Sequence, residues 1–384
     1  MAVERITELT IKGFKSFKSV DSFPLHRFNV LIGANGSGKS NFIDFFRMLN
    51  FAFGSSTGNL QLYAARKGRA NSILHYGAKF TLNLDGAIKF DGVNQWSRYS
   101  FRLGWGAPAE LFYARELLEY QREGKDSLPR QKQLGSGHLE SEVLKQADKK
   151  EGIALSTVAK VFRDRHRAIR VYHFHDTSDE SRVRLSQGMN RDQYLMSDAG
   201  NLAVFLYNLK QNKTGHYRKI LETVQLVAPF IDDFILEPKL LNEQSLLFRW
   251  KDHAGDIFGP HQLSDGTIRA IALITALLQP DEAMPSIMLF DEPELGLHPS
   301  AIQLISTLLK SASEKRQIIV STQSAILIRN YQPEDIIVVD RSETEKGRGE
   351  STLTRLETDQ LAAWLEDFDL GKLYEKNVTG GGPL

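Results

Sequence analysis

The sequence predicts an α/β fold in which helices flank a mostly parallel sheet, with a β-rich lobe at the N-terminus. Three segments carry this prediction: a strand, glycine-rich turn and helix at 28–49, an apolar helix at 263–278, and an apolar strand ending in carboxylates at 286–293. Continuous apolar strands are typical of parallel sheets, because both faces of such a sheet are covered. Ligands bind at the carboxyl ends of these strands.

The glycine-rich turn fits a phosphate-binding pattern. Residues 33–40, GANGSGKS, match G-x-x-x-x-G-K-[ST] at every position and lie between a strand and a helix. In that context backbone N–H groups and the helix N-terminus bind phosphate oxygens, so a glycine turn without a ligand is the less favoured alternative. We expect Lys39 to reach the β- and γ-phosphates and Ser40 to bind Mg²⁺, as in a P-loop NTPase. The residues expected to bind the nucleotide are Asn35, Gly36, Ser37, Gly38, Lys39, Ser40 and Asn41.

The apolar run at 286–290 leads directly into Asp291 and Glu292. At the carboxyl end of a buried parallel strand, Asp291 would hold Mg²⁺ through water, and Glu292 would orient and deprotonate the attacking water. The alternative is a buried strand that runs into an acidic turn. Beside a complete phosphate loop, the catalytic interpretation is favoured.

Residues 263–266, LSDG, open the apolar helix at 267–278, which Pro280 ends. Ser264 and the amide of Gly266 at a helix N-terminus form an anion site. The alternative is an ordinary N-cap made by Ser264 or Asp265. The order of the segments favours the anion site, since the phosphate loop comes first, this helix start second and the acidic strand third.

With these segments in this order, the chain resembles the ABC-type ATPase heads of the SMC and RecF group. It is more similar to the AAA-type ATPases related to the heads of the OLD family. The segments that carry the resemblance are 6–17, 30–41, 263–266 and 291–299. The resemblance implies ATP and Mg²⁺ as cofactors and a head-to-tail homodimer, in which Ser264 and Gly266 of one copy contact the γ-phosphate bound by the other. We also expect His298 to be a contact residue in the loop after the acidic strand and not a catalytic residue.

The chain departs from this family in the strand at 317–324. Gln323 stands where most of the family has a histidine. An amide can bond a phosphate oxygen or orient water and so sense the γ-phosphate, but it cannot accept a proton, so hydrolysis is expected to be slow. No glutamine loop is recognisable between the phosphate loop and the 263–266 motif. The stretch after Asp340 is too short for the nuclease domain of OLD-family chains, so a separate effector is expected.

Composition narrows the class of protein. The 384 residues include 48 basic and 47 acidic side chains, so no charge excess indicates nucleic acid or an acidic membrane as a partner, although nucleic acid stays open. The absence of cysteine excludes disulfides and thiolate chemistry. No secretory segment is recognisable, and the longest apolar helix is too short to cross a bilayer. We expect a cytoplasmic protein.

The expected organisation is a single head at 1–384. It divides into a β-rich lobe at 1–95, an insertion at 96–198, a lobe with the 263–266 motif and the acidic strand at 199–340, and an extension with a flexible tail at 341–384. Within it we expect three strands in 3–32, a loop at 54–58, a hairpin about Asp85-Gly86, and strands at 98–105 and 110–120. Further expectations are a polar surface excursion at 128–150, helices at 199–209 and before Pro229, strands at 234–237 and 245–250, and helix–strand alternation to Asp340.

Two clusters allow competing interpretations. The basic residues at 163–170 could bind nucleic acid phosphates, but a solvated face balanced by nearby acids is favoured. His173 and His175 could be metal ligands, but a half-buried strand is favoured because no third ligand is evident. Three function classes follow: an ATP-hydrolysing clamp in DNA repair or anti-phage defence, a non-hydrolysing ATP-dependent scaffold, and a transporter ATPase, which the long segment between the two phosphate motifs disfavours.

Overall fold

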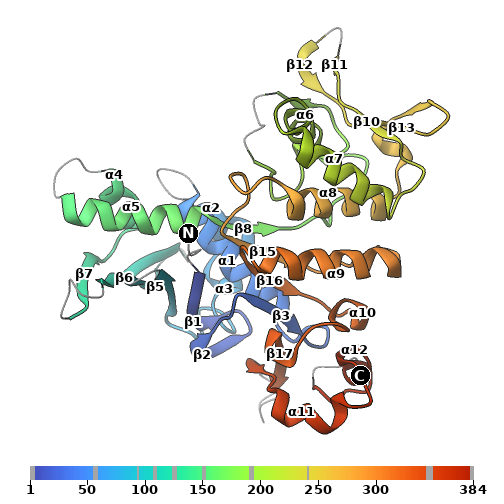
Figure 1. Ribbon diagram of the computed structural model, residues 1–384. Helices are drawn as coiled ribbons and strands as arrows, with labels where there is room; N and C mark the ends of the chain where they lie inside the picture. Colours follow the sequence, from blue (N-terminus) through green and yellow to red (C-terminus); the bar gives the residue numbers. More distant parts are fainter. Residues whose placement is uncertain are drawn as a thin grey trace.

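The computed structural model describes residues 5–380 except 55–58, 93–94, 107–109, 123–127, 149–152, 190–193, 240–241 and 343–348. Its centre is a six-stranded sheet of order β18-β17-β3-β16-β15-β8 (Figure 1). All neighbouring strands run parallel except β17 and β18, which confirms the predicted mostly parallel sheet. The strands are β3 (Phe28–Ile32), β8 (Ile169–Tyr172), β15 (Ile287–Asp291), β16 (Gln317–Ser321), β17 (Ile336–Ser342) and β18 (Glu350–Arg355).

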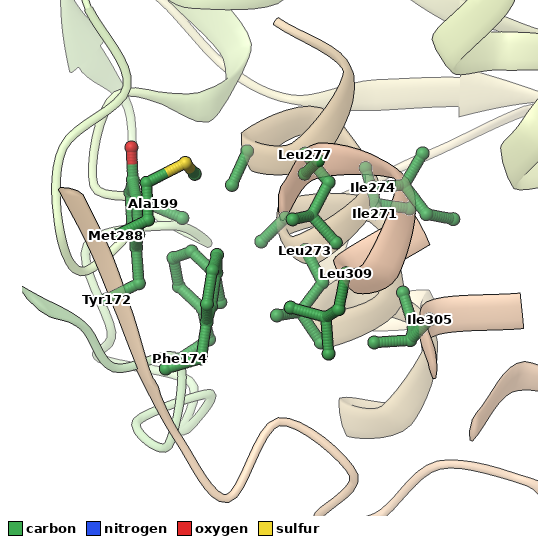
Figure 2. Close-up of a cluster of buried hydrophobic side chains, with 14 of the residues drawn as sticks. Tyr172, Phe174, Ala199, Ile271, Leu273, Ile274, Leu277, Met288, Ile305 and Leu309 are labelled. Carbon is green, nitrogen blue, oxygen red and sulfur yellow. The ribbon is translucent and has the colours of Figure 1, made fainter. Parts of the chain in front are cut away.

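Alternate residues of this sheet enter two different cores. Ile287 and Leu289 pack with α1 (Lys39–Phe53) and with the antiparallel sheet of the N-terminal lobe. Met288 and Phe290 pack on the other face, with α8 (Asp265–Leu278) and α9 (Pro299–Ser313). Figure 2 shows Tyr172, Phe174 and Met288 facing the apolar side chains of these two helices. Burial of both faces explains why β15 is a continuous apolar run.

The N-terminal lobe is an antiparallel sheet of order β2-β1-β4-β5-β6-β7. Its strands are β1 (Arg5–Phe14), β2 (Phe17–Pro24), β4 (Leu84–Gly92), β5 (Gln95–Gly106), β6 (Glu110–Arg122) and β7 (Arg130–Gly135). The strands predicted in 3–32, at 98–105 and at 110–120 are confirmed. Because β4 pairs with β5, the strands β5, β6 and β7 continue the sheet of the first lobe.

The predicted hairpin about Asp85-Gly86 is wrong, because β4 runs straight through both residues. Gly86 lies opposite Phe101 of β5, and a Cβ at Gly86 would come within 2.3 Å of the Phe101 ring. Asp85 pairs with Arg102, with 2.6 Å between Oδ1 and Nε. The glycine therefore makes room for a cross-strand aromatic ring and does not mark a turn.

The predicted surface excursion at 128–150 is correct for the exposed residues 130–135 but wrong for the helix that follows. Residues 130–135 form β7 at the edge of the sheet, where five of the six side chains are exposed, so a polar strand is tolerated there. Helix α4 (Glu142–Asp148) buries Val143, Leu144 and Ala147 in the core. The loop predicted at 54–58 and the flexible tail predicted after 380 fall mostly outside the described residues.

The helices predicted at 199–209 and before Pro229 are confirmed as α6 (Leu202–Asn212) and α7 (Thr214–Gln225), which lie beside α8 (Figure 1). The predicted strand at 245–250 is divided between β12 and β13, which belong to different small sheets. These sheets contain β9 (Gln187–Gly188), β10 (Asp233–Ile235), β11 (Pro238–Lys239), β12 (Asn242–Leu246), β13 (Arg249–Lys251) and β14 (Ile257–Phe258).

The predicted alternation of helix and strand to Asp340 is confirmed by α9, β16, α10 and β17. Among the described residues, no helix is both long and apolar enough to cross a membrane. The elements not yet named are α2 (Leu60–Lys67), α3 (Arg69–Ile73), α5 (Ile153–Arg167), α10 (Ala325–Ile328), α11 (Thr358–Leu365), α12 (Leu370–Glu375) and the short 3₁₀ turns Pro260–Gln262 and Pro333–Asp335.

The basic cluster at 163–170 is not simply a solvated face. Arg163 pairs with Asp164, but Arg165 is buried and donates a hydrogen bond to the Ser97 hydroxyl. His166 is buried, and its ring stacks on Phe53 with centroids 4.2 Å apart. The predicted solvated face is therefore wrong for Arg165 and His166, because both side chains fasten α5 to the core.

His166 should make the protein sensitive to acid. Burial lowers the pKa of His166 to about 4, whereas an unfolded histidine has a pKa of about 6.5. The neutral ring therefore stabilises the fold above pH 6.5, and this stabilisation is lost as the pH falls toward 4, by about 3 kcal/mol. Denaturant unfolding of the wild type and of His166→Phe between pH 7 and pH 4 should show a smaller loss in the variant. An equal loss would contradict the assignment.

Candidate active site

Three strands of the parallel sheet end at one edge. Asp291 of β15 lies opposite Ser321 of β16, and Ser321 lies opposite Leu31 of β3. The phosphate loop therefore follows β3 at the same level at which Glu292 follows β15. The structure thus brings together the first and third of the segments singled out in the sequence, with the Gln323 segment between them.

The phosphate loop is shaped by glycines and open at its tip. Gly36 and Gly38 have φ angles of 78° and 122°, which other residues rarely adopt. A Cβ at Gly36 would meet nothing within 4 Å, whereas a Cβ at Gly38 would lie 2.3 Å from the Ser351 hydroxyl. The hydroxyl oxygen of Ser37 is buried and has no hydrogen-bond partner among the described residues. An open tip and an unpaired buried hydroxyl fit a loop that surrounds a phosphate group.

Lys39 is folded back over this loop. Its Nζ donates to the carbonyl oxygens of Gly33 at 2.6 Å and Ala34 at 3.1 Å, and the residue is only 4% exposed. Burial lowers the pKa of Lys39, and the nearby carboxylates of Glu292 and Glu294 oppose this shift. A buried cation held by two neutral carbonyls is well suited to a phosphate anion.

Gln323 connects the phosphate loop to the expected general base. Its Nε2 donates to Asn35 Oδ1 at 2.6 Å and to Glu292 Oε1 at 3.1 Å. Its backbone N–H donates to Glu294 Oε1 at 3.0 Å. Glu294, which was not predicted from the sequence, thus fixes the end of the Gln323 segment, and burial raises the pKa of its carboxyl.

Glu292 has a left-handed backbone, with φ at 45°, and its N–H donates to the Ser321 carbonyl at 2.9 Å. For a residue other than glycine this conformation costs about 1–3 kcal/mol and is found mostly at functional sites. The turn directs the Glu292 side chain toward Gln323 instead of along the strand. The local strain is consistent with the role expected for this carboxylate.

Both carboxylate oxygens of Asp291 are engaged. Oδ1 accepts a hydrogen bond from the Ser321 hydroxyl at 2.6 Å, and Oδ2 lies 3.2 Å from the guanidinium of Arg47 on α1. The hydroxyl of Ser40 and the carboxylate of Asp291 are hard oxygen donors of the kind that Mg²⁺ prefers. The residues present therefore fit a magnesium site, although Arg47 competes for one of its ligands.

The prediction that His173 and His175 belong to a strand is wrong, because β8 ends at Tyr172. Tyr172 lies opposite Phe290, so His173 follows β8 at the level of Asp291. His173 therefore lies beside Asp291 at the same edge of the sheet. Desolvation, together with the positive charge of Arg47, lowers the pKa of His173. Among the described residues, no group of three His, Asp or Glu side chains could hold a metal ion.

The helix start at 263–266 lies at the beginning of α8, against the loop that follows β15. Ser264 is exposed and is also the N-cap of α8, since its hydroxyl accepts a hydrogen bond from Thr267 N at 3.1 Å. A Cβ at Gly266 would come within 2.2 Å of the Gly296 carbonyl, so glycine is needed for the close approach of the loop after β15. Within the described part of one copy, neither Ser264 nor Gly266 bonds to residues 33–41.

Two arginines that were not predicted from the sequence hold this helix start. Arg184 is buried, pairs with Asp265 at 2.8 Å and donates to the Leu263 carbonyl at 3.3 Å. Arg269 donates to the carbonyls of Leu295 at 3.0 Å and His175 at 2.8 Å. The only signal in the sequence was Arg269 itself, a lone charge in an apolar helix. Through Arg269, α8 is tied to the loops that follow β15 and β8.

His298 caps α9, because its Nδ1 lies 2.9 Å from the Ser300 hydroxyl and accepts from Ser300 N. It is exposed, and its side chain touches no predicted catalytic residue in the bonds described for one copy. The prediction that His298 is a contact residue of the loop after the acidic strand stays a prediction.

The chain is similar to three known ATP-binding or Smc head proteins. The ATP-binding protein EcfA of the energy-coupling factor transporter from Methanosphaera stadtmanae is 30% identical over 132 residues, or 32% of this chain and 44% of that protein. The Smc head bound to the C-winged helix domain of ScpA has a TM-score of 0.57 at 21% identity, covering 92% of this chain and 98% of that one. The Smc head with an extended coiled coil, bound to the C-terminal domain of ScpA from Pyrococcus furiosus, has a TM-score of 0.55 at 17% identity, covering 95% and 99%.

The match to EcfA spans less than half of that protein, and the two Smc heads share the fold alone. The predicted P-loop ATPase head of ABC type is thereby confirmed as a fold. A family model described as "AAA domain, putative AbiEii toxin, Type IV TA system" matches residues 28–329, which is more than half of the 384 residues. The chain therefore belongs to this family of AAA ATPase domains, and its fold is that of an SMC-type ATPase head.

Proposed function

We propose that the chain hydrolyses ATP in a head-to-tail homodimer and works as an ATP-dependent clamp or switch. The observation that carries this proposal is the separation within one copy of two half-sites. Asn35 and Gly36 at the tip of the phosphate loop are exposed, and Ser264 lies exposed at the start of a different helix. Two copies that face each other would complete two sites.

In this proposal the phosphate loop binds ATP, and Lys39 exchanges its two carbonyl partners for phosphate oxygens. Ser40 and Asp291 would hold Mg²⁺, which would neutralise charge on the β- and γ-phosphates. Glu292 would take a proton from the attacking water, and Gln323 would orient that water and sense the phosphate. Because Gln323 cannot accept a proton, the proposed base is Glu292, which accepts a hydrogen bond from Gln323.

The contacts of Arg269 support a link between the two half-sites. This side chain joins α8 to the Leu295 carbonyl, three residues after Glu292. If α8 shifts when a second copy binds, the loop next to the catalytic carboxylate of Glu292 would therefore move with it. ATP would close the dimer and hydrolysis would open it.

The output is proposed to act on a separate effector protein, in DNA repair or anti-phage defence. The family description refers to a toxin of a type IV toxin–antitoxin system, and the two similar Smc heads are bound to parts of ScpA. These relatives support an arrangement in which the head acts on a partner. A non-hydrolysing ATP-dependent scaffold is the second candidate, and the ion pair between Arg47 and Asp291 favours it.

The concentration dependence of ATP turnover tests this function. If each site needs two copies, phosphate release per copy should rise with protein concentration and then reach a plateau. Turnover per copy that is constant at all concentrations, in a protein shown to be monomeric, would contradict the composite site. ATP-dependent dimerisation without phosphate release would establish the scaffold instead.

Gln323 should permit catalysis but limit its rate. Gln323→His keeps a hydrogen-bonding side chain and adds basicity, so turnover should be retained or raised. Gln323→Ala removes the bonds to Asn35 and Glu292 and should lower turnover by about tenfold, the size of one lost hydrogen bond to a charged group. Single-turnover phosphate release measures both variants, and unchanged turnover in the alanine variant would place Gln323 outside the site.

A further inference from the structure

A second cleft lies along α1 and has Asp291 in its wall. It has a volume of about 1190 Å³, and none of its lining residues belongs to the loop at 33–41. α1, α2, α5 and β8 contribute to its walls. The cationic residues among those that line it are Arg47, Arg66, Lys67, Arg167 and Arg170.

The cations of this cleft exceed its carboxylates. The lining contains two acids, Asp44 and Asp291, and both are already paired, Asp44 with Lys67 at 3.2 Å and Asp291 with Arg47 at 3.2 Å. In the described part of the chain, no carboxylate lies within 4.0 Å of the charged nitrogens of Arg66, Arg167 or Arg170. The cleft therefore presents uncompensated positive charge to a ligand.

Arg170 shows the character of the site most clearly. Its guanidinium lies over the exposed ring of Tyr194, 4.5 Å from the centroid, and its Nε is buried without a hydrogen-bond partner among the described residues. An arginine beside an accessible aromatic face is the combination that binds phosphates and stacks bases. The cleft is also larger than most pockets for single small molecules, which are about 300–1,000 Å³.

Arg47 connects this cleft to the ATP site. Its guanidinium lies 3.2 Å from Asp291 and 3.8 Å from Asp44 Oδ1, the oxygen that also pairs with Lys67. Arg47 can therefore leave Asp291 without losing its only carboxylate. While the ion pair lasts, it occupies an oxygen that the proposed magnesium site needs.

We propose that the cleft binds single-stranded nucleic acid through its phosphates. This strand, which is distinct from the substrate ATP, switches on ATP hydrolysis. Its phosphates attract Arg47, Arg167 and Arg170, and Tyr194 stacks on a base. Arg47 then moves off Asp291, which becomes free to hold Mg²⁺. This step rests on the proposed ATPase function, whereas ligand binding to the cleft does not.

Binding is tested in the Lys39→Ala background, in which the ATP site is disabled. A fluorescein-labelled 5′-phosphorylated dT oligonucleotide should bind, as measured by anisotropy. Arg170→Glu should weaken this binding by about tenfold, since it replaces a phosphate contact with a repelling charge. The matched control, Arg218→Glu on the exposed side of α7, makes the same charge change and should leave binding unchanged.

The source of the ligand is tested by competition with a dT oligonucleotide, an rU oligonucleotide and AMP. Displacement by the oligonucleotides alone supports a nucleic acid strand, and displacement by AMP at an equal nucleotide concentration overturns it in favour of a free nucleotide. The proposal that the cleft binds nucleic acid is overturned if Arg170→Glu and Arg218→Glu bind the oligonucleotide equally well. It is also overturned if the parent protein does not bind the oligonucleotide. Melting temperatures close to that of the parent show that the variants are folded.

The switch is tested by ATP turnover with and without the oligonucleotide. The wild type should be stimulated, whereas Arg47→Gln should turn over at the stimulated rate without it, because Asp291 is already free. If Arg47→Gln turns over ATP slowly without the oligonucleotide, the proposal that Arg47 restrains hydrolysis is overturned. If the wild type hydrolyses no ATP under any condition, the proposed ATPase function fails, while the binding experiment still decides whether the cleft is a nucleotide site.

Discussion

Replacing Lys39 with alanine should abolish ATP binding and leave the fold intact. Lys39 is buried at the phosphate loop, where its Nζ donates to the carbonyls of Gly33 and Ala34. The loss of one charge-assisted contact to a buried anion costs about 3 kcal/mol, or roughly 100-fold in affinity. Isothermal titration with ATP and Mg²⁺ measures this loss.

The matched control is Lys219→Ala, which removes an exposed lysine of α7 and should bind ATP like the wild type. A melting temperature near that of the wild type would show that the Lys39 variant is folded. If the folded Lys39→Ala protein bound ATP as tightly as the wild type, the site at 33–41 would be wrongly assigned.

The second large effect is expected from Glu292→Gln. A general base contributes about 10²–10⁴-fold to a rate, so phosphate release should fall by that factor while ATP binding persists. The neutral amide also removes repulsion with the γ-phosphate, and its oxygen can still accept the hydrogen bond from Gln323. Because hydrolysis is the exit from the closed state, the variant should accumulate an ATP-dependent dimer, or a tighter form of an existing oligomer.

Adding Ser264→Arg to Glu292→Gln should remove that dimer. Ser264 is exposed at the start of α8, so an arginine there adds bulk and charge at the proposed interface without touching Lys39. Light scattering with and without ATP and Mg²⁺ distinguishes the single from the double variant. An ATP response that survives the arginine would exclude the contact in trans, and the loss of ATP binding in the double variant would leave the assignment of Ser264 unsupported.

The parts of the site that the sequence predicts are those encoded in short continuous segments. The phosphate loop, the helix start at Ser264 and the strand before Asp291 each contain their own strand, turn or helix signals, and each forms the expected element. The phosphate loop and Asp291 meet at one sheet edge because parallel strands end there at the same level. The roles of these residues in ATP binding and hydrolysis stay predictions.

The parts that the sequence did not predict depend on contacts between distant residues. Arg47 and Asp291 are 244 positions apart, and Gln323 and Asn35 are 288 positions apart. The local periodicity of a sequence does not indicate which distant residues form such pairs. The Asp85-Gly86 error has the same origin, because that glycine is required by Phe101 on the neighbouring strand and not by a turn.

ATP turnover in a mixture of two inactive variants tests the composite site most directly. Ser264→Arg retains the phosphate loop and Glu292, whereas Glu292→Gln retains Ser264, so one site of a mixed dimer contains every proposed residue. Each mixed dimer has one intact site, so turnover in the mixture should rise above that of either variant alone. A mixture as inactive as its two components, in which mixed dimers are shown to form, would contradict the claim that two copies share each ATP site.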